Sequence, residues 1–327
     1  MIGTVILNYK VISLIGEGGM GKVYLAENEQ IGLKVAIKVL NTQFFNHEDI
    51  KARFKREAKT LALLDHPNIV KLLNYYEDDK GLYLIMEYVD GNTLDEYIEN
   101  VNGLIPEEKA IKFFTRLLDA MNSAHENGII HRDLKPSNIM INKNEDIKIL
   151  DFGIAKIIDE EIDHKLTRTG TRLGTVAYMS PEQIRGQKLT TATDIYSLGV
   201  ILFQMLTGKC PYDTSDISEF DLTVKIVQEP LPRMKAIYPY VSDELQIVVD
   251  KATSKEIINR FESIKDLRNE LLVPKSKINS NLKLNKPNNV LKEPESYRKE
   301  GIIIFIVYIL IIVGFISFLI KNHLNFY

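Results

Sequence analysis

Four polar residues near the middle of the chain have types and a spacing that could do chemistry. Asp133, Lys135 and Asn138 lie at fixed offsets in one short stretch, His131–Asn138, and Asp151 follows thirteen residues later at the end of an apolar segment. Asn138 and Asp151 can offer oxygen ligands to a metal ion, a carboxylate can orient a hydroxyl group, and a lysine can neutralise phosphate charge. Transfer of a phosphoryl group requires these residue types, so the spacing predicts that chemistry.

A glycine-rich stretch, Gly16–Gly21, lies near the N-terminus between two segments that we predict to be strands, 9–15 and 22–27. Gly16, Gly18 and Gly21 have the spacing GxGxxG, in which the missing side chains let backbone N–H groups approach phosphate oxygens. In a dinucleotide-binding fold a helix would follow at once, but here the alternating, strand-like segment 22–26 follows. The pattern therefore predicts a hairpin that covers the phosphates of a nucleotide.

A lysine and a glutamate on the next two predicted elements suit each other as partners. Lys38 ends a predicted strand, 35–38, and Glu57 lies on a predicted helix, 48–64. Glu57 shares one face of that helix with Leu61 and Leu64, at spacings of i+4 and i+7, so this face points inward. Because a charge buried alone is costly, we predict an ion pair between Glu57 and Lys38.

The periodicity of the chain changes after residue 90. Strands are predicted at 69–76 and 82–88, and an extended connection at 87–91 leads to a mostly helical remainder. Helices are predicted at 93–100, 106–127, 194–207, 243–253 and 264–272, whereas 211–239 gives loops and one or two helices without clear bounds. We therefore predict an α+β fold in which residues 1–274 form one domain with a small β-rich lobe, about 9–90, and a larger helical lobe, about 91–274.

The composition argues against nucleic-acid binding and against a body stabilised by disulfides. The net charge of the 327 residues is −3, with +5 in residues 275–327 and −8 in the first 274. An acidic body has no electrostatic reason to bind nucleic acid. Cys210 is the only cysteine, so an intrachain disulfide is excluded and the body fits a reducing compartment.

The C-terminal part differs from the rest. Residues 302–320 are nineteen residues without a charge, about 28 Å as a helix against a hydrocarbon core of about 30 Å. We predict a transmembrane helix at 301–320, rather than a core or interfacial helix, with a basic juxtamembrane linker at 275–300 and a short extracytoplasmic tail at 321–327. The first domain would then be cytoplasmic, held at the cell membrane by a single pass. The basic residues of the linker are equally consistent with binding to anionic lipid and with ordinary solubility of the linker.

With these residues in place, the chain resembles the eukaryotic-type (Hanks-type) protein kinases, above all the membrane-anchored serine/threonine kinases of bacteria. The resemblance runs from Tyr9 to Leu272, with the motifs in the family's order. It implies a bilobal protein kinase fold and transfer of the ATP γ-phosphoryl group to Ser or Thr hydroxyls of proteins. The implied cofactors are ATP and Mg²⁺, with Mn²⁺ as a substitute. The implied partners are ATP, protein substrates and the lipid bilayer, and a homodimer is left open.

The resemblance also implies a role for each matching residue. Asp133 corresponds to the catalytic aspartate, Lys135 to the lysine that contacts the γ-phosphate, and Thr175 to the threonine that bonds to both. Asn138 and Asp151 correspond to the metal ligands. The residues that correspond to the ATP-binding site are Ile15, Gly16, Glu17, Gly18, Gly19, Met20, Gly21, Val23, Ala36, Lys38, Glu57, Met86, Glu87 and Val89. Among them, Glu87 and Val89 would hydrogen-bond adenine through their backbones, and Met86 corresponds to the gatekeeper residue that precedes them.

Regulation and alternatives follow from the same comparison. Thr167, Thr169 and Thr171 are candidates for autophosphorylation in a segment that is otherwise read as a flexible surface loop, and Arg132 would pair with the phosphate. Glu182 and Arg260 correspond to a buried ion pair of the larger lobe. A catalytically silent pseudokinase scaffold at the membrane and a small-molecule phosphotransferase of related fold are the alternatives.

Overall fold

The computed structural model describes residues 1–18, 21–40, 47–79, 81–100, 103–152, 176–212 and 217–272. Among these residues, no helix is both long and apolar enough to span a membrane. The predicted linker, span and tail at 275–327 lie outside the described residues, and so does the threonine-rich segment.

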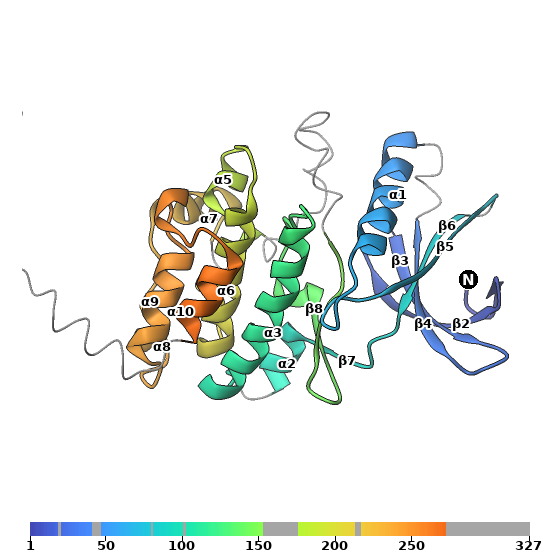
Figure 1. The fold of residues 1–327 in the computed structure, drawn as a ribbon, viewed down its shortest axis with the longest axis horizontal. Coiled ribbons are helices and arrows are strands. Elements are labelled where there is room, and N and C mark those ends of the chain that lie inside the picture. Colours follow the sequence, from blue (N-terminus) through green and yellow to red (C-terminus); the bar gives the residue numbers. More distant parts are fainter. Residues whose placement is uncertain are drawn as a thin grey trace, which may run out of the picture. The chain divides into compact units, whose positions relative to one another are not determined.

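The N-terminal part is an antiparallel sheet with one long helix against it (Figure 1). The strand order is β1-β2-β3-β4-β6-β5, so β1 to β4 are neighbours in chain order, whereas β6 lies between β4 and β5. The elements are β1 (Val5–Ile6), β2 (Tyr9–Glu17), β3 (Gly21–Asn28), β4 (Lys34–Leu40), α1 (Glu48–Leu63), β5 (Leu72–Asp78) and β6 (Gly81–Glu87).

The two faces of this sheet bury different side chains, because successive residues of a strand point to opposite faces. Val35 and Ile37 of β4 join a cluster with Tyr83 and Ile85 of β6. The alternate residues of the same strands join the larger core together with α1; they are Ala36, Leu40, Leu82, Leu84 and Met86 from the strands and Ile50, Phe54, Ala58 and Leu61 from the helix. Lys38 lies between Ala36 and Leu40 on β4, so the strand alternation directs its side chain towards α1.

The C-terminal part is mostly helical, as the sequence predicts. A small sheet with the order β7-β8-β9 lies at its start. Figure 1 shows α3, α6, α9 and α10 gathered in this part. The elements are β7 (Gly91–Thr93), α2 (Leu94–Asn100), α3 (Glu107–Glu126), η2 (Pro136–Asn138), β8 (Ile139–Asn142), β9 (Ile147–Ile149), α5 (Pro181–Ile184), α6 (Thr191–Thr207), α7 (Glu219–Gln228), α8 (Met234–Ile237), α9 (Asp243–Ala252), η4 (Ile257–Asn259) and α10 (Ile264–Leu271).

Helix α6 forms the centre of this part, and nearly all of its residues are buried. Gly199 lets it pack closely against α9, because a Cβ atom at this position would lie 2.6 Å from Cγ2 of Thr253. The helix ends at Gly208, which has φ +72° and no room for a side chain, since a Cβ atom would overlap the carbonyl oxygen of Gly103. A glycine satisfies both demands of this helix end.

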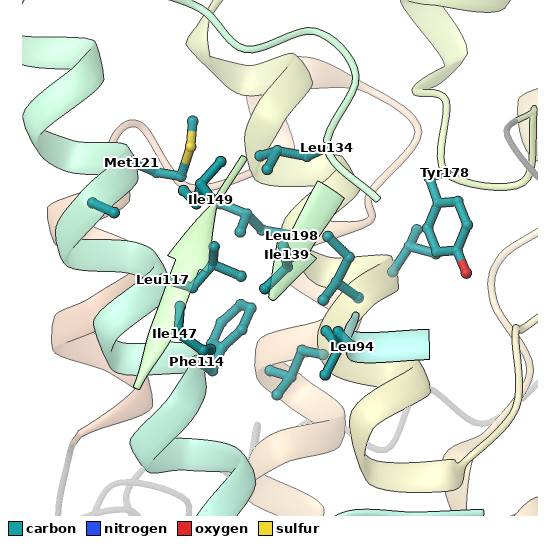
Figure 2. Packing of buried hydrophobic residues seen from close by; sticks show 14 of the residues in the cluster. Leu94, Phe114, Leu117, Met121, Leu134, Ile139, Ile147, Ile149, Tyr178 and Leu198 are labelled. Carbon is teal, nitrogen blue, oxygen red and sulfur yellow. The ribbon is translucent and has the colours of Figure 1, made fainter. Parts of the chain in front are cut away.

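The strand β9 packs on α3, and β8 pairs with β9. Figure 2 shows Ile147 and Ile149 beside Phe114, Leu117 and Met121 of the helix. All five side chains are fully buried. This apolar layer supports the hairpin from which the loop and Asp151 extend.

Three elements differ from the predicted ones. The strand expected at 69–76 begins at Leu72, because Ile69 forms an isolated bridge with Ile149 instead. The residues 91–93, expected as part of a helix or its approach, pair as β7 with β8 before the helix begins at Leu94. Helix α6 begins at Thr191, three residues earlier than predicted.

Candidate active site

One buried carboxylate, that of Asp194, holds the loop that carries Asp133. Asp194, in the first turn of α6, accepts hydrogen bonds from the backbone N–H groups of His131 and Arg132, both at 2.9 Å. The ring nitrogen Nε2 of His125 lies 2.8 Å from the same carboxylate. Three contacts to a side chain that is 1% exposed hold the start of the loop in one conformation, with Arg132 at φ 66°.

His131 acts as a neutral packing residue in this loop. Burial lowers its pKa, although the charge of Asp194 acts in the opposite direction. Its Nδ1 accepts the backbone N–H of Asp133 at 3.3 Å, which requires this nitrogen to be unprotonated. The ring lies 4.8 Å from the ring of Phe152, the residue after Asp151, so the two predicted motifs are packed together.

The polar side chains of the loop lie within contact of one another. Lys135 Nζ is 3.2 Å from Asp133 Oδ2, and the two side chains are 21% and 18% exposed. Asn138 Nδ2 donates to the carbonyl oxygen of Asp133 at 2.9 Å, which leaves its Oδ1 atom as the acceptor end. The carbonyl oxygen of Asn138 accepts the N–H of Leu150 at 2.9 Å, which places the loop directly beside Asp151.

Lys38 joins the N-terminal sheet to this group. Its Nζ lies 2.6 Å from Glu57 Oε1 and 3.5 Å from Asp151 Oδ1. Burial would lower the pKa of Lys38, but the charges of Asp151 and Glu57 outweigh it and raise the pKa above its ordinary value. Lys38 is therefore a cation at neutral pH, and the predicted ion pair with Glu57 is confirmed.

The predicted nucleotide residues of the sheet lie on neighbouring strands. Val23 of β3 is opposite Lys38 of β4, and Ala36 is opposite Met86 of β6. Glu87 ends β6, and the segment with Val89 leaves the sheet there. Because directly opposite residues share a face and residues two apart on a strand do too, Val23, Lys38, Ala36 and Met86 from three strands lie on one face of the sheet.

The β2–β3 turn carries the glycines. Gly18 donates its N–H to the carbonyl oxygen of Gly21 at 2.9 Å, and a Cβ atom at Gly21 would lie 2.3 Å from the carbonyl oxygen of Val39. Ile15, Gly16 and Glu17 are the last three residues of β2. The remaining predicted site residues, Gly19, Met20, Thr167, Thr169, Thr171 and Thr175, lie outside the described residues.

One contact of the site, made by Gln183, is not predicted from the sequence. Gln183 Nε2 donates to the carbonyl oxygen of Arg132 at 2.7 Å, and its Oε1 accepts the N–H of Ser180 at 2.9 Å. Gln183 thus ties the start of α5 to the loop of Asp133. The spacing Ser180-x-x-Gln183 is a capping-box pattern that signals the helix start, but nothing in it signals the contact with Arg132.

Comparison with known proteins decides the family. The family described as the protein kinase domain matches residues 9–272. The chain belongs to the protein kinase family. It is 43% identical over 264 residues to the probable serine/threonine-protein kinase PknB of Lactococcus lactis, with coverage of 80% of this chain and 41% of that protein. It is 40% identical over 263 residues to the serine/threonine-protein kinase PrkC of Bacillus subtilis, with coverage of 80% and 40%.

The fold agrees with this assignment. A crystal structure of a mutant of the Mycobacterium tuberculosis PknI kinase domain aligns with a TM-score of 0.63 at 25% sequence identity, covering 83% of this chain and 97% of that chain. The kinase fold, with its β-rich N-lobe and helical C-lobe, is therefore confirmed. The chain spans about two fifths of the length of the curated relatives it matches.

Proposed function

We propose that this kinase is a serine/threonine protein kinase, which transfers the γ-phosphoryl group of ATP to Ser or Thr hydroxyls of proteins. The observation that carries the proposal is the position of Lys38, which contacts both Glu57 of α1 and Asp151 after β9. A cation held between two carboxylates from both lobes, next to the Asp133 and Asn138 loop, suits the phosphates of a nucleotide.

The side chains divide the work by position. Asp133 would accept a hydrogen bond from the incoming hydroxyl and orient it for attack, and Lys135 beside it would neutralise charge on the transferred group. Lys38 would hold the other phosphates, kept in place by Glu57. The chain's own groups would therefore bind and orient the two reactants, which is the main contribution that phosphoryl transfer needs from a protein.

The residues around Asp151 fit a divalent metal ion, which we propose to be Mg²⁺ bound together with ATP. The side chain of Asp151 is 42% exposed, and the amide of Asn138 directs its nitrogen to Asp133, so that its oxygen is the end available to a cation. Mg²⁺ in such sites takes one or two protein oxygens and the phosphates of its substrate. The ion would offset the charge of the phosphates.

The pseudokinase alternative is not favoured. A scaffold that no longer transfers phosphate has no use for a buried Lys38–Glu57 ion pair, and burying two charges costs free energy that only specific contacts offset. Here the contacts are present, and the loop of Asp133 is held by Asp194. A small-molecule phosphotransferase is also less favoured, because PknB of Lactococcus lactis and PrkC of Bacillus subtilis, to which the chain is similar, are both named as protein kinases.

Phosphoamino-acid analysis tests the choice of acceptor. Purified kinase, Mg-ATP and a generic acceptor protein should yield phosphoserine or phosphothreonine, and the Asp151→Asn variant should yield neither. Phosphotyrosine as the main product would contradict the proposal, and equal labelling by Asp151→Asn would show that the label comes from another enzyme.

We also propose that activation follows autophosphorylation at Thr167, Thr169 or Thr171. Arg132 supports this, because its Nε atom is buried without a hydrogen-bond partner among the described residues. A phosphate would add a charge of about −1.5 to −2 near such a guanidinium. Replacement of all three threonines by alanine should abolish the activation that preincubation with Mg-ATP produces in the wild type. Unchanged activation would contradict it.

Finally, we propose that the kinase domain is cytoplasmic and anchored to the cell membrane by residues 301–320. The support is the uncharged run of nineteen residues at 302–320 after a basic linker. Full-length protein should remain with the membrane fraction in high salt and at alkaline pH, and protein ending at residue 274 should not. Release of the full-length protein by salt would contradict a membrane span.

A further inference from the structure

A second lysine, Lys148, connects the two lobes through an ion pair. Lys148 is the middle residue of β9, between Ile147 and Ile149. These two neighbours are fully buried and pack on α3 (Figure 2). Because side chains alternate along a strand, Lys148 points to the opposite face, away from the core of the C-lobe.

On that face Lys148 meets Glu87, the last residue of β6. Its Nζ lies 2.8 Å from Glu87 Oε2, and the two side chains are 16% and 35% exposed. The backbone N–H of Lys71 also points to this carboxylate oxygen at 3.4 Å, and the N–H of Glu87 donates to the carbonyl oxygen of Lys71 at 2.9 Å. Glu87 is thus held on two sides, by β9 and by the start of β5.

The segment before β5 is itself attached to β9. Asn68 Nδ2 donates to the carbonyl oxygen of Ile147 at 2.8 Å, and the carbonyl oxygen of Asn68 accepts the N–H of Ile149 at 2.9 Å. Val70 donates to the carbonyl oxygen of Ile149 at 2.8 Å. Three hydrogen bonds therefore fix this part of the N-lobe to the strand that leads to Asp151, and the ion pair extends the attachment to the end of β6.

We propose that Lys148 is a positioning residue for the nucleotide, because it holds Glu87 at a fixed place relative to Asp151. The inference rests on the proposed function, which has Asp151 at the phosphates, and on the adenine contact that the resemblance to kinases implies for the backbone at Glu87. The two ends of one ATP molecule are then bound by segments that Lys148 joins. Without the ion pair, the end of β6 keeps only its indirect connection to β9 through the backbone of Lys71 and Val70, and ordering the looser segment on binding costs affinity.

The chain offers a matched control pair. Lys143, in the turn between β8 and β9, contacts Asp90, three residues after Glu87, at 2.6 Å. These two side chains are 75% and 58% exposed. An exposed ion pair is screened by water and contributes little, so its loss should not change nucleotide affinity. The control has the same chemistry and joins neighbouring segments, but it lacks the burial.

The test uses the full-length kinase and measures binding separately from transfer. Titration calorimetry with Mg-ATP gives the affinity, and steady-state rates with a generic acceptor protein give KM and kcat. Lys148→Met, which keeps the apolar stem, should weaken affinity and raise the KM for ATP about fivefold, with kcat changed less than about twofold. Glu87→Gln should match it, Lys148→Arg should stay close to wild type, and Lys143→Met should bind ATP as wild type does.

The exchanged pair, Lys148→Glu with Glu87→Lys, should recover part of the affinity that either single change loses. Unchanged affinity in both Lys148→Met and Glu87→Gln would overturn the inference, as would an equal loss in Lys143→Met. A fall in kcat with unchanged affinity would also overturn it. If the wild type binds Mg-ATP but transfers no phosphate, the proposed function fails, while the binding series still decides the role of Lys148.

Discussion

Replacement of Arg260 by methionine should destabilise the C-lobe more than any surface substitution. The guanidinium donates from Nη1 and Nη2 to the two carboxylate oxygens of Glu182, each at 2.8 Å. It also donates to the carbonyl oxygens of Ala192 at 2.9 Å and Ser254 at 2.7 Å. The two charged side chains are 0% and 2% exposed, so water cannot replace the lost contacts.

The size of the effect follows from what remains. In Arg260→Met the carboxylate of Glu182 stays buried with the hydroxyl of Thr193, at 3.0 Å, as its side-chain partner. Removal of one member of a buried ion pair costs about 3–5 kcal/mol, and the buried carbonyl oxygen of Ala192, left without its donor, adds about 1 kcal/mol. We therefore expect a loss of about 4–6 kcal/mol. The second change Glu182→Gln in the same protein should restore about 1–3 kcal/mol, because it removes the unpaired charge.

Unfolding in guanidinium chloride, followed by circular dichroism, measures this loss. The pH dependence gives a second check. Burial would raise the pKa of Glu182, but the hydrogen bonds and charge of Arg260 outweigh it and lower the pKa below 4.5. The wild type should keep this stabilisation above pH 4.5 and lose it as the pH falls through the lower folded-state pKa, whereas Arg260→Met should lack that step. A loss below about 1 kcal/mol, with no change in the pH dependence, would refute the reasoning.

Three further predictions concern other parts of the fold. Gly91→Ala should lower the free energy of unfolding by about 2 kcal/mol or more, because a Cβ atom there would lie 2.0 Å from the carbonyl oxygen of Ile141. Thermal unfolding measures this loss, and an unchanged melting temperature would contradict it. Burial lowers the pKa of Lys255 from 10.5 to about 8, so the unfolded chain binds the proton more tightly and the free energy of unfolding should rise between pH 8 and 10.5. Lys255→Met should flatten this rise. An equally steep rise in the variant would exclude the lowered pKa. Glu57→Gln should lower kcat/KM about tenfold or more in initial-rate assays, because Lys38 loses the negative charge of its partner at 2.6 Å. A rate within about twofold of wild type would be inconsistent with the pairing.

The parts of the site that the sequence predicts are those with a local signal. Glu57 shares a helix face with Leu61, and a charge on an inward face needs a partner, which identified Lys38 before the structure showed the 2.6 Å contact. The two lobes also follow from local patterns, because period-2 and helical segments separate at residue 90. Glu182 and Arg260 came from the resemblance to kinases, and their contact is confirmed.

The features that the sequence does not predict depend on contacts between distant segments. The strand β7, Gly91–Thr93, is too short for an alternating pattern and exists only because β8 pairs with it. Nothing in the sequence around Lys148 indicates its ion pair, since its partner Glu87 is 61 residues away. Such contacts are set by how the elements pack, which no local pattern encodes.

The most direct measurement is the initial rate of γ-phosphoryl transfer from Mg-ATP to a generic protein acceptor, compared between the wild type and Asp133→Asn. The carboxylate of Asp133 would orient the attacking hydroxyl, and the variant keeps its shape while it removes the charge. We predict that the wild type labels Ser and Thr and that Asp133→Asn is slower by about 10²-fold or more. Equal rates in the two proteins, or no labelling by a wild type that binds ATP, would contradict the account.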